Sequence, residues 1–243
     1  KLGTILNDGR LAGLIDWNAI EDRTRMLRGL PSWKNPSEII DSAYHSFKLD
    51  RWAPQPNRVE VWIEKDALVG VIERTCQRHD VNFFSCRGYV SQSEMYVAAQ
   101  RLEAHINDGQ DVHVLHLGDH DPSGIDMTRD IDSRIEMFLE GLGCAVNRLA
   151  LNMGQVQKYN PPPNPAKLTD SRCQAYIRRF GNSSWELDAM DPAMLDTLIE
   201  TNILALRDDT IWQDTLDEEL HHKNLLQETA SRWDDVASYL QNE

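Results

Sequence analysis

The chain has 243 residues, of which 41% are hydrophobic and 26% are charged, and its formal net charge at pH 7 is −14. This is a globular composition, with enough residues for a sizeable core in one domain or two. No apolar run approaches the roughly 20 residues of a membrane span and no signal-peptide pattern is present, so no membrane partner is expected. The acidic balance argues mildly against DNA as a partner, because duplex-binding proteins usually carry a basic surface. A bound divalent ion and a local basic patch can both offset that balance.

The four cysteines are widely separated and form no CxxC pair (Cys76, Cys86, Cys144 and Cys173). Their spacing predicts neither a zinc site nor a disulfide framework. A reduced, cytoplasmic compartment is therefore the expected location.

Residues 1–57 are expected to form a lead-in module. Because the chain begins with Lys1 rather than Met, we interpret this module as the end of a truncated DNA-binding domain. Residues 9–17 predict a turn and a short extended piece, and the charged residues 18–25 are compatible with helix or loop. Residues 36–44 predict a helix with proline in its first turn. The prolines within residues 52–56 predict a linker.

Residues 58–150 alternate between strand and helix patterns. Strands are expected at 59–63, 81–85, 112–117 and 144–149, with helices beginning near Asp66, Ser93 and Ser123. Such alternation with short connections predicts an α/β fold with a doubly wound parallel sheet. Residues 151–243 begin with a proline connector and continue as helical patterns, which predicts a helical C-terminal region packed on the sheet domain.

Acidic residues follow two of the predicted strands. Glu64 follows the strand at 59–63, and Asp119 and Asp121 follow the strand at 112–117. The carboxyl ends of parallel strands meet at one edge, where open α/β sheets bind their ligands. Three carboxylates with no His or Cys at matching spacing suit Mg²⁺, with Mn²⁺ as an alternative ion. The sequence therefore predicts a metal site in which these three acids are also the catalytic residues.

Several neighbouring residues are candidates for binding phosphate or DNA. Lys65 follows Glu64. The backbone N–H groups of Ser123 and Gly124 open the helix that follows the turn containing Asp119 and Asp121, here called the acid turn. The loop after the second strand adds further candidates, which are Arg87, Gly88 and Ser91. For this loop, a plain turn and helix cap is an equally weighted alternative.

Other interpretations of the acid turn stay open. Asp119 and Asp121 also match turn and helix N-cap residues, and their spacing matches the opening of an EF-hand loop. A strand-like run stands where an EF-hand needs a helix, which makes the calcium loop the weaker alternative. His116 alternates with apolar residues and predicts a packed core side chain. For His120, between the acids, we expect exposure to solvent, with a proton-shuttle role less favoured.

The two acid motifs resemble those of the Toprim domain, the metal-binding module shared by topoisomerases, bacterial-type primases and several nucleases. Residues 63–67 (Ile-Glu-Lys-Asp-Ala) and 117–124 (Leu-Gly-Asp-His-Asp-Pro-Ser-Gly) fit its pattern of an acid after the first strand and D-x-D after the third. The variant in the topoisomerase VI A-subunit family is most similar, and Glu186 and Asp188 resemble an acidic segment that follows Toprim there. Toprim proteins of phages and mobile elements are also similar. The resemblance implies Mg²⁺-dependent chemistry on DNA phosphodiester bonds.

The sequence also departs from that pattern. Ser123 stands where many Toprim domains carry a third acid, and Tyr44 is the only tyrosine before Glu64, too close to it to match the family's nucleophile. The resemblance therefore implies nicking or cleavage of DNA and leaves open whether water or a tyrosine attacks. The alternative function is a non-catalytic Toprim subunit of a phage or defence assembly that binds metal together with DNA or protein. A homodimer or a partner subunit is the expected assembly in that case.

Overall fold

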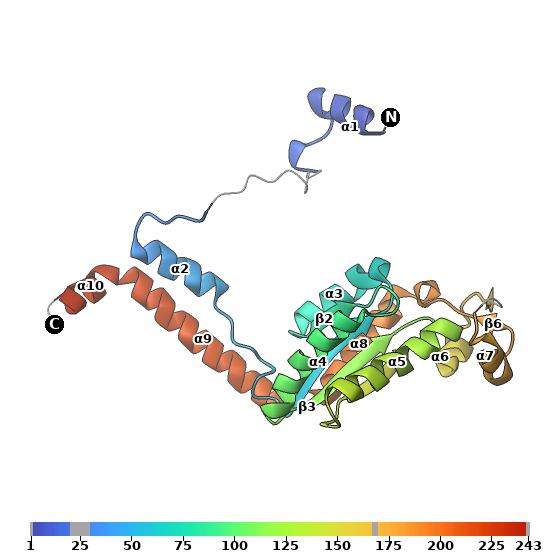
Figure 1. Ribbon diagram of the computed structural model, residues 1–243. Helices are drawn as coiled ribbons and strands as arrows, with labels where there is room; N and C mark the ends of the chain where they lie inside the picture. The colour runs from blue at the N-terminus through green and yellow to red at the C-terminus, as the bar shows by residue number, and fades with distance from the viewer. Residues whose placement is uncertain (1, 20–29, 167–169, 242–243) are drawn as a thin grey trace. The chain divides into compact units, whose positions relative to one another are not determined.

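The computed structural model describes residues 2–19, 30–166 and 170–241. The chain divides into two compact units, one of residues 46–225 and one formed by residues 1–45 with residues 226–243. The first of these units contains the sheet and every candidate site residue (Figure 1). Among the described residues, no helix combines the length and the apolar character needed to cross a membrane.

Four parallel strands form the sheet. They are β1 (Asn57–Ile63), β2 (Asn82–Ser85), β3 (Asp111–Leu117) and β4 (Ala145–Ala150), and their order is β2-β1-β3-β4. The register places Ile63 beside both Ser85 and Leu117, so β1, β2 and β3 end at the same edge. The α/β class and the parallel sheet predicted from strand–helix alternation are confirmed, and the topology is consistent with a Rossmann-like fold.

Helices cover both faces of this sheet (Figure 1). α3 (Val69–Arg78) and α8 (Pro192–Leu206) pack together over one face, where alternate β1 residues such as Val61 point. α4 (Gln92–Asn107) and α5 (Pro122–Phe138) cover the other face, into which Trp62 projects. Burial on both faces explains the nearly continuous apolar sequence of β1.

Short elements link β4 to α8. They are α6 (Met153–Tyr159), β5 (Asn164–Pro165), α7 (Cys173–Phe180), β6 (Ser183–Ser184) and a 3₁₀ turn at Leu187–Ala189, and β5 pairs with β6. A further 3₁₀ turn, Asp66–Leu68, connects β1 to α3. After α8 the chain continues through α9 (Asp209–Ser231) and α10 (Trp233–Gln241).

The other unit is built from the two ends of the chain. It contains α1 (Leu2–Leu11), a 3₁₀ turn at Trp17–Ala19 and most of α2 (Pro36–Ser46). Within it, the Ser37 hydroxyl donates to the Ala230 carbonyl at 2.7 Å, which ties α2 to the end of α9. The helix predicted at 36–44 and the helices predicted in the tail are confirmed.

Two local predictions near the N-terminus differ from the structure. Residues 9–11 complete α1 rather than forming a turn, and most of the charged stretch 18–25 lies outside the described residues. Residues 52–56 are not a free linker, because Trp52 is buried and its indole N–H donates to the His79 carbonyl at 2.8 Å. The prolines there shape a turn, and the adjacent indole anchors that turn in the core.

An ion pair between a buried carboxylate and a half-buried arginine connects α4 to the middle of the sheet. Glu60 is only 1% exposed, and Arg101 donates to its two carboxylate oxygens at 2.7 and 3.0 Å, while the Trp62 indole donates at 2.9 Å. Replacing Arg101 by Met leaves the buried Glu60 carboxylate without its cation, so we expect the free energy of unfolding to fall by about 2 to 3 kcal/mol. Urea denaturation at pH 7 measures this change.

The matched control is Arg232→Met, which removes an arginine from exposed ion pairs with Glu228 and Asp235. Exposed pairs of this kind contribute less than about 1 kcal/mol. Equal losses in the two variants would contradict the role assigned to the buried pair.

Candidate functional site

The acidic residues gather where the direction of the sheet winding changes. β1 and β3 are neighbours, while the chain between them visits β2 on the far side of β1. Crevices at such switch points are the usual ligand sites of open α/β sheets. Glu64 follows β1, and its carboxylate Oε2 accepts a hydrogen bond from the Asp119 backbone N–H at 2.9 Å. The predicted meeting of these two acids is therefore present in the structure.

Two glycines allow this close approach. A Cβ atom on Gly118 would lie 2.8 Å from Glu64 Oε2. A Cβ atom on Gly124 would lie 2.3 Å from the carbonyl oxygen of Asp119, which is far inside van der Waals contact. The acid turn and the first turn of α5 therefore pack directly against each other through backbone.

Asp121 is the N-cap of α5. Its Oδ1 accepts hydrogen bonds from the Ser123 hydroxyl at 2.9 Å and from the Gly124 N–H at 2.6 Å. The N-cap interpretation of this aspartate is confirmed, and it accounts for the sequence pattern Asp-Pro-Ser-Gly. Of the two backbone N–H groups predicted to contact phosphate, that of Gly124 is engaged by Asp121, while Ser123 contacts Asp121 through its hydroxyl. Their phosphate role stays a prediction.

Burial and the repulsion between neighbouring carboxylates raise the pKa values of Glu64 and Asp119. The pKa of Glu64 is raised from 4.5 to about 7, first by burial and then by the nearby charges of Asp119 and Asp121. Burial also raises the pKa of Asp119, against the effects of the Leu187 N–H and of Lys65. The three carboxylates therefore act on one another electrostatically, and a cation between them would relieve that repulsion.

Lys65 is paired with acidic side chains. Its Nζ atom lies 3.1 Å from Asp119 Oδ2, 2.8 Å from Glu186 Oε2 and 3.3 Å from Asp188 Oδ1. Burial opposes its charge, but these carboxylates outweigh burial and raise the pKa of Lys65. The phosphate contact predicted for this lysine would require it to exchange one of these partners.

Arg148 of β4 donates hydrogen bonds to the backbone of the acid turn. The sequence patterns did not predict this role. The Arg148 guanidinium donates to the backbone carbonyls of Gly118 at 3.1 Å, Gly124 at 2.8 Å and Asp119. Burial lowers its pKa to about 10, so it stays charged at neutral pH. The one available signal was an arginine within the otherwise apolar end of a strand, and its partners depend on long-range register.

Residues 183–188 pack against the acid turn from outside the sheet. His120 and Trp185 exchange backbone hydrogen bonds at 2.8 and 3.0 Å, and the Leu187 N–H donates to Asp119 Oδ1 at 2.7 Å. The resemblance of the Glu186 segment drew attention to this region, but pairing with His120 was not predicted. This segment fixes the orientation of the Asp119 carboxylate.

The two histidines near the acids are both buried. His116 is fully buried, as predicted for a core side chain, and Nδ1 lies 2.9 Å from the Thr128 hydroxyl. His120 is 1% exposed and its Nδ1 lies 2.8 Å from the Tyr176 hydroxyl, so the expected exposure to solvent is wrong. Successive residues of an extended chain point to opposite sides, and the His120 ring therefore packs among aromatic residues away from the acids.

The loop after β2 contains the remaining candidates for phosphate binding. Gly88 has a positive φ of 86° and its N–H donates to the Glu64 carbonyl at 3.2 Å, so this loop does lie beside the first acid. Arg87 is exposed and pairs with Asp66 at 3.2 Å, while Ser91 caps α4 by accepting from the Glu94 N–H. The cap interpretation is confirmed for Ser91, and the phosphate roles of the three residues stay predictions.

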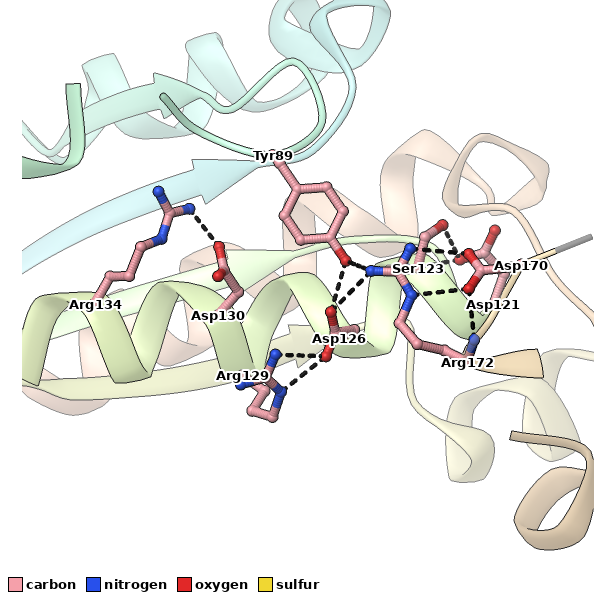
Figure 2. Close-up of polar contacts among 10 residues, drawn as sticks. Tyr89, Asp121, Ser123, Asp126, Arg129, Asp130, Arg134, Asp170 and Arg172 are labelled. Carbon is pink, nitrogen blue, oxygen red and sulfur yellow. Dashed lines mark hydrogen bonds and ion pairs between the residues drawn. The ribbon is translucent and has the colours of Figure 1, made fainter. Parts of the chain in front are cut away.

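A second polar network borders the acid turn and joins three separate segments (Figure 2). The Tyr89 hydroxyl, from the loop after β2, donates to Asp126 Oδ2 of α5 at 2.7 Å. Arg172, just before α7, contacts Tyr89 and Asp126 and also pairs with Asp170 at 2.8 Å. Figure 2 shows these side chains pointing toward one another, which ties the linking segment to the sheet domain.

The ligand atoms and the negative charge of this site suit a divalent cation. Glu64, Asp119 and Asp121 supply the oxygen donors that Mg²⁺ prefers. The negative charges of Asp119 and Asp121 also repel that of Glu64, and a bound cation would reduce this repulsion. Across the part of the chain that the structure describes, however, no group of three or more His, Cys, Asp or Glu side chains is arranged to hold a metal ion. Binding would therefore require the side chains of Glu64, Asp119 and Asp121, here called the acid cluster, to rearrange.

Comparison with known proteins adds no family assignment to this geometry. A scan against protein-family models finds no match, and no curated protein matches the sequence. The α/β architecture and the acid cluster at its switch point are thus the observations on which a function is inferred.

Proposed function

We propose that the chain carries a Toprim-like domain that binds Mg²⁺ and cleaves or nicks DNA at phosphodiester bonds. The observation that carries this proposal is the convergence of Glu64 with Asp119 and Asp121 at the switch point, where burial and then the charges of the two aspartates raise the pKa of Glu64 to about 7. Clustered carboxylates at such a position are a costly arrangement for a folded protein, which favours a functional role over a structural one.

The chemistry assigned to these residues follows from their positions. Glu64, Asp119 and Asp121 would hold the ion, which would supply charge stabilisation at the phosphate and the leaving oxygen. Glu64, with its pKa near neutrality, is suited to carry a proton in general acid–base catalysis. Arg148 keeps the backbone of the acid turn in place without facing a substrate, because its donors are directed to backbone carbonyls.

One observation favours a second candidate function. Asp119 has hydrogen bonds to both of its carboxylate oxygens, from the Leu187 N–H and from Lys65, and such internal neutralisation suits a domain that binds without turnover. In this alternative, the chain is a non-catalytic subunit that binds metal together with DNA or a partner chain. Turnover distinguishes the two functions, since metal binding fits both.

Nicking of supercoiled plasmid in Mg²⁺ or Mn²⁺ tests the lead proposal. We expect cleavage by the wild type, suppression by EDTA, and rates at least about 100-fold lower in Asp119→Asn and in Glu64→Gln, because each loses a ligand charge. Asp132→Asn, which removes an exposed carboxylate from α5, is the matched control and should keep full activity.

The state of the DNA ends identifies the attacking group, and two other results would count against the lead proposal. Free DNA ends indicate attack by water, and protein attached to the ends indicates attack by a side chain. Nicking that persists in EDTA or in Asp119→Asn would refute the lead proposal. Metal binding without any cleavage by the wild type would support the non-catalytic alternative.

A further inference from the structure

The Lys65 ammonium lies among carboxylates in the manner of a bound cation. Three oxygens, one each from Asp119, Glu186 and Asp188, surround Nζ at distances between 2.8 and 3.3 Å. Charge-assisted contacts of this length are the strong ones in proteins. A positive charge that belongs to the chain itself therefore already faces the carboxylate of Asp119.

Separate parts of the fold hold this arrangement in place. Lys65 directly follows Glu64 at the end of β1, where the Glu64 N–H is fixed to the Leu117 carbonyl at 2.9 Å. Glu186 and Asp188 are held near it because Leu187, between them, donates its N–H to Asp119 Oδ1. The lysine side chain is 23% exposed, so its flexible stem allows the ammonium to leave Asp119 toward solvent.

We propose that the Lys65 ammonium is the internal counterion of Asp119, and that a divalent cation binds the Asp119 carboxylate only after displacing this ammonium. This inference rests on the proposed function, because it takes Asp119 as one of the cation ligands. Glu186 and Asp188 then hold the displaced ammonium close to the site. Lys65 is a positioning residue in this scheme, and it lowers the affinity of the site for metal.

The contacts of Asp119 give the physical reason. Its Oδ1 accepts from Leu187 N–H and its Oδ2 faces Lys65, so an ion bonded to Oδ2 would meet the ammonium at a separation where two cations repel strongly. The same contact supplies a positive charge to Asp119 in the absence of an ion, while the buried Arg148 guanidinium interacts electrostatically with Glu64, Asp119 and Asp121. It also accounts for the lack of a ready three-ligand metal group among the residues that the structure describes.

Titration calorimetry with Mn²⁺ on the full chain tests this competition. Lys65→Met is expected to bind Mn²⁺ at least about tenfold more tightly than the wild type, because the ion no longer competes with the ammonium. Lys223→Met, which removes the same charge from an ion pair with Glu219 on α9, should leave the dissociation constant unchanged within about twofold. Unchanged or weaker binding in Lys65→Met would overturn the inference.

A further variant separates this inference from the proposed function. Asp119→Asn is expected to lose Mn²⁺ binding both alone and combined with Lys65→Met. If Asp119→Asn binds Mn²⁺ as the wild type does, the proposed cation site is wrong. If Asp119→Asn abolishes binding while Lys65→Met matches the wild type, the cation site stands and the counterion role fails.

A measurement on the wild type removes any dependence on how the variants fold. The ¹⁵N–¹H resonance of the Lys65 ammonium is identified by its absence in Lys65→Arg. It should be observable because the carboxylate partners slow the exchange of the ammonium protons with water. Addition of Mg²⁺ is expected to shift it as the contact with Asp119 is lost. A resonance that stays constant while calorimetry records Mg²⁺ binding would contradict displacement.

Discussion

Gly124→Ala is expected to lower the free energy of unfolding by about 3 kcal/mol or more, a loss typical of severe backbone overpacking. The added Cβ would lie 2.3 Å from the Asp119 carbonyl oxygen and 3.0 Å from its carbonyl carbon. Neither atom can move independently, because Arg148 donates to that carbonyl and Asp121 caps the same turn of α5. Urea denaturation followed by circular dichroism measures the loss.

Gly70→Ala provides the matched control for this prediction. Gly70 lies within helix α3, is exposed, and has no atom within 4 Å of an added Cβ. Alanine there should stabilise the protein by up to about 1 kcal/mol through helix propensity alone. A Gly124→Ala protein as stable as the wild type would contradict the direct packing of α5 on the acid turn.

Glu64→Gln is expected to stabilise the metal-free protein increasingly as the pH rises. The pKa of Glu64 is about 7 in the folded protein, against 4.5 as its ordinary value. Ionisation above pH 4.5 therefore favours the unfolded chain, and the cost to the wild type reaches its full size above pH 7. The gain from glutamine should be about 1 kcal/mol at pH 5 and about 3 kcal/mol at pH 8, apart from a constant offset for the substitution itself.

Unfolding in EDTA at these two pH values measures the effect. Glu136→Gln, at an exposed position on α5, is the control and should show no such growth with pH. A Glu64→Gln gain that is the same at both pH values would refute the raised pKa. If the proposed cation site is correct, Mg²⁺ at pH 8 should stabilise the wild type and reduce the difference.

The meeting of Glu64 with Asp119 can be predicted from the sequence because it depends only on local patterns. Apolar strands that end in Glu64 and in Asp119, separated by helix patterns, place both acids at one edge of any parallel sheet. The N-cap role of Asp121 is equally local, since Pro122 and Gly124 belong to the same turn. These features depend on neighbours within a few residues of each acid.

The surroundings of the acids could not be predicted in the same way. The contacts of Arg148 depend on the register of β4, and those of Lys65 depend on the return of residues 183–188 to the acid turn. For His120, exposure to solvent was predicted wrongly, because the Tyr176 and Trp185 partners that bury it lie more than 50 residues away along the chain. Long-range contacts thus decide which charges are balanced internally.

An anomalous-scattering map from a crystal of the full chain soaked in Mn²⁺ would show whether the acids at the switch point bind a divalent cation. We expect a peak at the carboxyl edge of the sheet, bonded to Glu64 and Asp119 with Asp121 alongside, and a Lys65 ammonium moved away from Asp119. The same soak of Asp119→Asn should lack the peak. A wild-type map with Mn²⁺ only at other surface carboxylates, and none at the switch point, would contradict a cation site formed by these acids.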